Sequence, residues 1–325
     1  SLLFAAAMAV GLGVEAAKGS QAKNATRRWI GGVVASLRNL SGKGIAVSLG
    51  LGVVFGGFLS FVWTPVLSKH FSYKNLFKSY FDHRTGDEPL AVLGIPGSGP
   101  EYYARGSFEK LSNRSELLGF LGRGERVFAI ASASELCAVH QEASTRSAQY
   151  HVLDNRSSRF LLLTNKLTGG ETDQNPLLSA IGRSPPASMK RPVTADFEGT
   201  IELIGADLPD RVGHGERFSM TLFYRVNGKP SMSYKVFVHF DTVGSRFQGD
   251  HDPIDGRCGT TFWQAGDYIT DTFPVTAGEL TNPRGTYSIY VGFFTGSAGR
   301  WKNMVVRKGD ADSNNRVKLG SIQIR

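Results

Sequence analysis

Asp250, Asp252 and Asp255 place three carboxylates within six residues, and Gly256 follows the last of them. Calcium prefers several oxygen ligands, which one loop can supply when a glycine permits a sharp turn. The spacing is not that of an EF-hand, and aspartate side chains also stabilise turns by accepting hydrogen bonds from nearby backbone amides. The segment therefore predicts a structural turn, with a calcium site at these three residues as the alternative. Calcium is the one cofactor indicated.

Two histidines close to this segment are further candidate metal ligands. His239 and Asp241 lie two positions apart in a predicted strand, so they point to the same face. Together with His251 they could bind a transition metal. A hydrogen-bonded polar pair at the end of the strand is the interpretation that we prefer.

Four aromatic side chains of the same region are candidates for binding a sugar ring: Phe247, Trp263, Tyr268 and Trp301. Aromatic rings offer a flat apolar surface on which a sugar can stack, although large aromatic residues also fill protein cores. No Ser-His-Asp order, pair of general acids or nucleophile elbow can be argued from the spacing of the remaining residues. The sequence therefore predicts no catalytic residue.

The two cysteines, Cys137 and Cys258, fall in different predicted domains. Two cysteines give neither a disulfide framework nor a zinc signature. Cys137 lies in the apolar stretch 135–140 and is predicted to be a small core residue. No role is predicted for Cys258.

The aspartates, histidines and aromatic residues belong to a region of short strands and turns. Alternation of apolar and polar residues is clear in 218–224 and 287–293, as expected when one face of a sheet is buried. Residues 197–325 are therefore predicted to form an antiparallel β-sandwich. Its seven predicted strands are 201–204, 217–226, 233–240, 268–275, 285–294, 305–307 and 317–324.

Residues 69–166 are predicted to form a small α/β domain. The predicted strands are 89–95, 126–131, 150–154 and 159–164, with helices over 107–121 and 134–143. The aromatic segment 70–88 before them either rests at a membrane interface or packs on this domain as a connecting helix. Residues 167–196, rich in Gly, Pro, Ser and Thr, are predicted to be a linker or an extended strap.

Residues 1–68 are predicted to contain two transmembrane helices, Ser1–Ala17 and Ile45–Val66. The second runs for 22 residues without a charge, which suffices for a membrane span, and Pro65 is expected to mark its exit. The loop 18–43 between them carries six Lys and Arg and no acid, so we expect it to be cytoplasmic. Much of the net charge of +9 thus reflects topology, and nucleic acid is not an expected partner.

This topology places everything after the second helix outside the cytoplasm, in the periplasm of a bacterium. The chain begins directly with apolar residues, without an initiator Met or the basic start of a signal peptide. We therefore expect it to be the C-terminal part of a longer inner-membrane protein. The fold class predicted overall is a multidomain membrane protein with N-terminal transmembrane helices, a small α/β domain and a C-terminal antiparallel β-sandwich.

Four segments together resemble the periplasmic C-terminal β-sandwich of some bacterial GT-C glycosyltransferases, the relatives of protein mannosyltransferases and of lipid A aminoarabinose transferases. They are Lys235–Asp241, Gly249–Gly256, Trp263–Asp271 and Gly285–Phe293. The middle domain, with Tyr102-Tyr103 and the segment 158–165, looks like the α/β domain of the same proteins. The resemblance implies transfer of a sugar from a polyprenyl-phosphate carrier. The catalytic acid of that class lies upstream of this chain, so no catalytic residue can be assigned from it.

Two other functions remain open. The chain could be a non-catalytic, membrane-anchored subunit that binds a glycan or a protein, or a structural subunit of a larger membrane complex. The partners expected across these hypotheses are the lipid bilayer, a lipid-linked sugar, an acceptor glycan and other membrane subunits.

Overall fold

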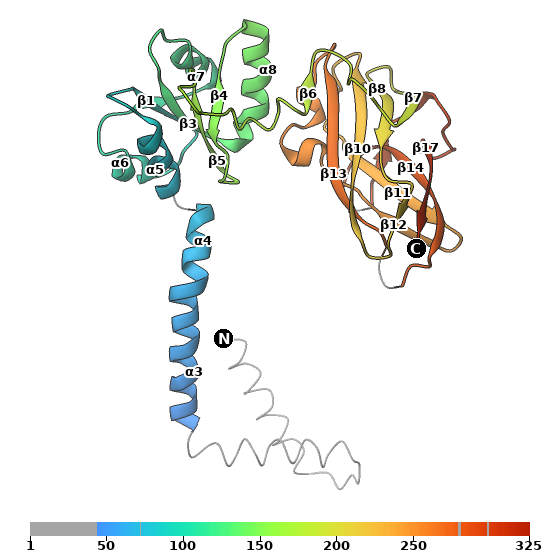
Figure 1. The fold of residues 1–325 in the computed structure, drawn as a ribbon, viewed down its shortest axis with the longest axis horizontal. Coiled ribbons are helices and arrows are strands. Elements are labelled where there is room, and N and C mark those ends of the chain that lie inside the picture. The colour runs from blue at the N-terminus through green and yellow to red at the C-terminus, as the bar shows by residue number, and fades with distance from the viewer. Residues whose placement is uncertain (1–43, 72, 279–280, 298) are drawn as a thin grey trace. The chain divides into compact units, whose positions relative to one another are not determined.

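The computed structural model describes residues 44–71, 73–278, 281–297 and 299–325 (Figure 1). The chain divides into two compact units, Ser1–Lys69 and His70–Arg325. The predicted transmembrane helix Ser1–Ala17 and the basic loop 18–43 lie outside the described residues.

The first unit is described as an apolar helix. It consists of α3 (Gly44–Phe58), one π-helical turn η1 (Leu59–Trp63) and α4 (Thr64–Phe71). Residues 48–68 are long and apolar enough to cross a membrane, and none of their most apolar window is buried.

The predicted end of this helix at Val66 is too early, because the helix continues through Pro65 to Phe71. In the π-helical turn the N–H of Thr64 donates to the carbonyl of Leu59, and the Thr64 hydroxyl donates to the same oxygen at 2.7 Å. Pro65 is thus the second residue of a renewed α-helix. A proline is tolerated there, because its missing N–H is not needed in a first turn.

The second unit, His70–Arg325, begins with a five-stranded sheet in the order β2-β1-β3-β5-β4. β1 pairs with β2 and β3 in parallel, and β5 pairs with β3 and β4 antiparallel. The strands are β1 (Leu90–Leu93), β2 (Glu109–Leu111), β3 (Phe128–Ser132), β4 (His151–Asp154) and β5 (Phe160–Thr164). The helices are α5 (Lys74–His83), α6 (Gly99–Tyr103), α7 (Arg114–Leu121), η2 (Ala133–Glu135) and α8 (Leu136–Arg146).

Both faces of this sheet are covered. Ala91 and Leu93 of β1 belong to the apolar cluster that includes α7 and α8, whereas Leu90 and Val92 belong to the cluster that includes α5. A strand buried on both sides needs an uninterrupted apolar run, which is why β1 and β5 show no alternation. The burial of Phe77 and Tyr80 shows that the segment 70–88 contains a connecting helix packed on this domain.

The helix predicted over 107–121 is wrong in its first part, which forms the edge strand β2. The helix begins only at Arg114, because the Asn113 side chain caps it by accepting the N–H of Glu116 at 2.9 Å. The Glu116 carboxylate in turn accepts the N–H of Ser112 at 2.8 Å. These contacts closely follow a capping box and fix the start of α7.

The rest of the chain folds as a β-sandwich of two sheets. One has the order β16-β7-β8-β10-β13-β6, and the other has the order β12-β11-β14-β17-β9 with β15 added to β14. The predicted strands are β8 (Ile201–Asp207), β10 (Arg217–Val226), β11 (Lys235–Thr242), β13 (Tyr268–Thr276), β14 (Gly285–Thr295), β16 (Val306–Lys308) and β17 (Val317–Ile324). The strands not predicted are β6 (Ile181–Gly182), β7 (Arg191–Phe197), β9 (Arg211–Val212), β12 (Ser245–Gln248) and β15 (Lys302–Asn303).

Residues 167–196, predicted to be a linker or a strap, run through turns and short strands into the sandwich. Ile181 pairs with Ile269 of β13, and Arg191 begins β7 beside β8. Leu177, which lies after the α/β domain and before β6 in sequence, is fully buried. The segment is therefore part of the folded body.

Candidate functional site

The three carboxylates predicted as calcium ligands do not converge. Each has its own partner: the Val238 N–H for Asp250 at 3.0 Å, Lys235 Nζ for Asp252 at 3.1 Å, and Arg257 Nε for Asp255 at 3.9 Å. Among the described residues, no three His, Cys, Asp or Glu side chains are grouped so that they could hold a metal ion. In this structure the three side chains are therefore held by separate partners, and the segment is built as a turn.

His239, Asp241 and His251 do not form a metal site either. Asp241 accepts hydrogen bonds from Arg246 and Arg316. His239 Nε2 lies 3.6 Å from an Asp250 carboxylate oxygen. The preferred interpretation of His239 and Asp241 as one hydrogen-bonded pair is also wrong, because each side chain has a different partner.

His251 contacts a buried carboxylate that the sequence did not single out. Its Nε2 lies 3.0 Å from Asp271 Oδ2, its Nδ1 lies 2.8 Å from the Gly249 carbonyl, and its ring stacks on Phe273 with centroids 3.7 Å apart. Burial opposes protonation of the imidazole, but the hydrogen bond and charge of Asp271 outweigh it, so the pKa of His251 is raised. The pair is therefore a charge-assisted contact inside the sandwich.

The other oxygen of Asp271 holds a strained turn. It accepts the N–H of Ile254 at 2.9 Å. Ile254, Asp255 and Gly256 have φ angles of 54°, 53° and 71°, so three successive residues lie in the left-handed region. For a β-branched residue such as Ile254 this conformation is unfavourable, and strain of this kind tends to gather at functional sites.

The four aromatic candidates do not form one sugar-binding surface. Trp263 is fully buried and Phe247 is buried, so neither ring is exposed to solvent in this structure. Tyr268 is half-buried at the start of β13, whereas Trp301 is 57% exposed and packs against Phe294 in the other sheet. Next to the buried Trp263, Phe262 is exposed, at 40%. Its position beside Trp263 is the one sequence signal for it, since two adjacent aromatic residues rarely face the same core.

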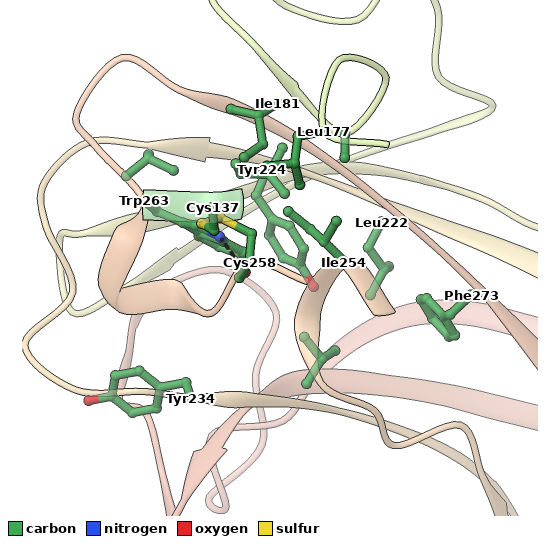
Figure 2. Close-up of a cluster of buried hydrophobic side chains, with 14 of the residues drawn as sticks. Cys137, Leu177, Ile181, Leu222, Tyr224, Tyr234, Ile254, Cys258, Trp263 and Phe273 are labelled. Carbon is green, nitrogen blue, oxygen red and sulfur yellow. Dashed lines mark hydrogen bonds between the residues drawn. A yellow bond between two sulfur atoms is a disulfide. The ribbon is translucent and has the colours of Figure 1, made fainter. Parts of the chain in front are cut away.

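The cysteines form a disulfide, Cys137–Cys258, which the sequence did not predict. It links α8 of the α/β domain to the segment before the turn η4 (Thr260–Phe262) of the sandwich. Figure 2 shows it among buried apolar side chains that include Tyr224 and Trp263. The Trp263 indole N–H donates to the Cys258 carbonyl at 3.2 Å. Cys137 is thus a core residue, as predicted, but a covalently paired one.

A buried polar contact lies at the same join. Asp267 is fully buried, and its Oδ2 accepts hydrogen bonds from the Gln141 side chain at 3.0 Å and from the Gln264 N–H at 2.8 Å. Arg183 Nη1 lies 3.1 Å from the other oxygen. The α/β domain and the sandwich also share one continuous apolar cluster. The two therefore form one body fixed by covalent, polar and apolar contacts.

Two cavities open along this join, and Phe262 borders both. The first, of about 590 Å³, has a polar lining of Ser134, Asn155, Arg156, Ser157, Ser158 and Arg257. The second, of about 450 Å³, is lined by Arg114, Glu142, Arg146, Lys229 and Gln264. We call the two cavities and Phe262 together the join groove. It is the candidate functional site of the described residues.

No family model and no curated protein matches the chain. Several solved structures are similar to about two fifths of it. The C-terminal domain of Wzt is 9% identical, covers 42% of this chain and 82% of its own, and has a TM-score of 0.28. The CARDB domain of a Pyrococcus furiosus protein in complex with di-metal ions is 16% identical, covers 40% of this chain and 94% of its own, and has a TM-score of 0.22. A β-glucosidase from Listeria innocua in complex with laminaribiose is 13% identical, covers 40% of this chain and 16% of its own, and has a TM-score of 0.23. Similarity at this level identifies neither a family nor an activity.

Proposed function

We propose that this chain is the C-terminal portion of a membrane glycosyltransferase that uses a polyprenyl-phosphate-linked sugar. In this proposal the helix 44–71 spans the bacterial inner membrane. The body 70–325 lies in the periplasm, where it covers the active site or holds the acceptor. The observation that carries the location is the combination of an exposed apolar helix with a disulfide-linked body.

The apolar helix supports the membrane part of the proposal. Val53, Val54 and Phe61 are largely exposed, and no side chain of the most apolar stretch is buried. In water such a surface is unfavourable, whereas in a bilayer core of about 30 Å it is matched by lipid. The basic loop 18–43 favours a cytoplasmic side for the residues before the helix.

The disulfide supports the periplasmic part of the proposal. Disulfides persist in oxidising compartments, including the bacterial periplasm, and are rare in the reducing cytoplasm. Cys137 and Cys258 lie on the same side of the helix 44–71 in sequence, as a periplasmic body requires.

A non-catalytic role for the body is supported by the state of its carboxylates. The buried acids of the described residues are Asp154, Asp267 and Asp271, and each holds local structure. Asp154 binds Arg156, Asp267 binds Gln141, and Asp271 holds the turn at Ile254. The resemblance to GT-C enzymes likewise implies that the catalytic acid lies upstream of this chain.

Activity is tested with the complete gene product and with residues 1–325, both in proteoliposomes with a radiolabelled polyprenyl-phosphate sugar and candidate acceptors. We expect transfer by the complete protein and none by residues 1–325. Turnover by residues 1–325 would contradict the proposal. If the natural protein has no further membrane spans, the alternative function is favoured, which is a membrane-anchored subunit that binds a glycan or a protein without catalysis.

Topology is tested independently with reporter fusions. A reporter after Arg325 should be active only outside the cytoplasm, and one at Asn39 only inside. Inverted activities would refute the periplasmic location whatever the outcome of the activity assay.

A further inference from the structure

Phe262 is an exposed aromatic ring on a firmly held support. It ends the turn η4, which follows the disulfide at Cys258 and precedes the fully buried Trp263. The N–H of Phe262 donates to the Gly259 carbonyl at 3.0 Å. A ring held in this way on both sides, with a cavity to either side of it, presents a flat apolar surface without a large ordering cost.

The first cavity beside Phe262 offers groups that suit a sugar carrying a negative charge. Three serine hydroxyls and the Asn155 amide can bond sugar hydroxyls. Arg156 uses Nε and Nη2 for its two bonds to Asp154, at 3.0 and 2.6 Å, which leaves Nη1 for a ligand. Arg257 is exposed, and among the described residues its ion-pair partner is the distant Asp255, at 3.9 Å. Guanidinium groups bind carboxylates and phosphates with strong, oriented hydrogen bonds.

The second cavity is also more basic than acidic. Arg114 and Arg146 share the Glu142 carboxylate, at 3.7 and 2.6 Å, and Arg114 also pairs with Glu135 at 3.1 Å. Lys229 makes no ion pair with any residue in the described part of the chain. Over both cavities, five cationic side chains face two acidic ones. Such an excess of one sign attracts ligands of the opposite charge.

The wall of the first cavity is preorganised. Asp255, Gly256 and Arg257 line it, and they follow directly from the strained turn that the buried Asp271 holds at Ile254. The disulfide fixes the opposite side of the same cavity through Cys137. The buried groups hold this strained backbone in place, so the lining residues have their positions before a ligand binds. The loss of conformational entropy on binding is therefore smaller.

We infer that the join groove binds an acidic oligosaccharide, with one sugar ring stacked on Phe262 and carboxylate or phosphate groups on the cations to either side. Each cavity falls within the range of about 300–1,000 Å³ that is usual for small-ligand sites. The assignment of this ligand as the acceptor rests on the proposed function, whereas the binding itself does not.

The test is titration calorimetry of residues 1–325 in detergent micelles, with tetragalacturonate as the acidic probe and maltotetraose as the neutral one. We expect saturable binding of tetragalacturonate, at least ten-fold weaker binding of maltotetraose, and weakening of the acidic complex by added salt. Phe262→Ala should lower the affinity at least ten-fold. Arg257→Gln and Lys229→Gln should each lower it several-fold.

Matched controls come from exposed residues away from the groove. Trp301→Ala removes an exposed aromatic side chain and Lys308→Gln removes an exposed cation, and both should leave the affinity unchanged. Near-ultraviolet circular dichroism and thermal melts check that each variant folds. Absence of saturable tetragalacturonate binding, an unchanged affinity in Phe262→Ala, or an equal loss in Trp301→Ala would each overturn the inference. Because this assay needs no turnover, its failure is distinguishable from failure of the glycosyltransferase proposal.

Discussion

The apolar helix 44–71 and the body 70–325 use the same residue types in opposite ways. Phe61 is 84% exposed in the helix, whereas Phe293 is fully buried in the sandwich. Gly50 and Gly56 of the helix have no neighbour within 4 Å of a would-be Cβ, while in the body a Cβ at Gly292 would clash with the Phe237 ring. The body therefore satisfies its apolar residues internally, and the helix relies on its surroundings to do so.

Charged groups sharpen the same contrast. The body buries Asp267 and Asp271, and each makes polar contacts with neighbours at about 3 Å. The stretch Ile45–Val66 contains no charge at all. A buried charge is tolerated where a partner is fixed beside it. The body can therefore hold precise polar contacts, and we place recognition there and anchoring in the helix.

The largest effect should follow from removing the Trp263 side chain. Trp263→Ala deletes the largest fully buried ring, which packs against Tyr224 and Phe293, and should destabilise the body by about 3–5 kcal/mol. Trp301→Ala, at an exposed position, should cost no more than about 1 kcal/mol. Denaturant unfolding followed by circular dichroism measures both. Equal losses would break the division between buried core and exposed surface.

Removing the disulfide should have the next largest effect. The double variant Cys137→Ala, Cys258→Ala releases a crosslink between residues 121 apart and should destabilise the body by about 2–5 kcal/mol. A thiol assay on the unfolded, unreduced protein should detect no free cysteine. If two reactive thiols are found, the crosslink and its support for a periplasmic location both fall.

A charge placed on the apolar helix should act on membrane insertion and spare the body. Val53→Lys should raise the free energy of insertion by about 2.5–3.5 kcal/mol if the helix spans the bilayer. Val243→Lys, at an exposed site of the body, is the matched control and should change nothing. Resistance of the protein to alkaline extraction from membranes measures insertion. A loss of body stability in Val53→Lys would show that the helix packs in the folded protein instead of in lipid.

The smallest effect should be the pH dependence of the His251–Asp271 contact. The pKa of His251 is raised in the folded state, so its contribution to stability is fully present below the unfolded value near 6.5 and is lost as pH rises through the raised pKa. Asp250 and the Gly249 carbonyl favour the same protonated form. His251→Gln should therefore destabilise the body more at about pH 5 than at about pH 9.

His140 provides a control of opposite sign. Burial lowers the pKa of its imidazole, so its effect on stability becomes unfavourable as pH falls. The substitution His140→Gln should thus remove a loss of stability at low pH. Urea unfolding of both variants at the two pH values separates the contributions. The same pH trend in both would contradict the assignment of His251.

Local sequence pattern predicted the helices and strands whose buried and exposed positions follow a simple repeat or an unbroken apolar run. Short strand-forming runs between turns predicted β10 and β17 with the bounds that the structure gives, and in β10 alternation supported the prediction, because a strand buried on one face repeats every two residues. An uncharged run identified the apolar helix for a similar reason, since its length and composition suffice. The start of α7 is also encoded locally, in the Asn113–Glu116 cap, whereas the helical spacing of apolar residues alone places it too early.

Only the tertiary structure decided which residues meet. The partner of Cys137 is 121 residues away, and nothing near either cysteine specifies the other. Asp250, Asp252 and Asp255 are close in sequence yet contact different partners, and the left-handed turn at Ile254 redirects the chain between Asp252 and Asp255. Periodicity predicts side-chain direction in helices and strands, but in an irregular turn each direction follows from contacts with distant segments.

Tertiary contacts also decide which of the adjacent rings Phe262 and Trp263 is buried. The sequence shows two adjacent aromatic residues here but does not show which of the two rings is exposed. That choice depends on the Trp263 indole reaching the Cys258 carbonyl inside the sandwich, which leaves Phe262 facing outward. A core is filled by residues that come from several elements at once. The identity of its members is therefore a property of the assembled fold, whereas the tendency to form each element is a property of the local sequence.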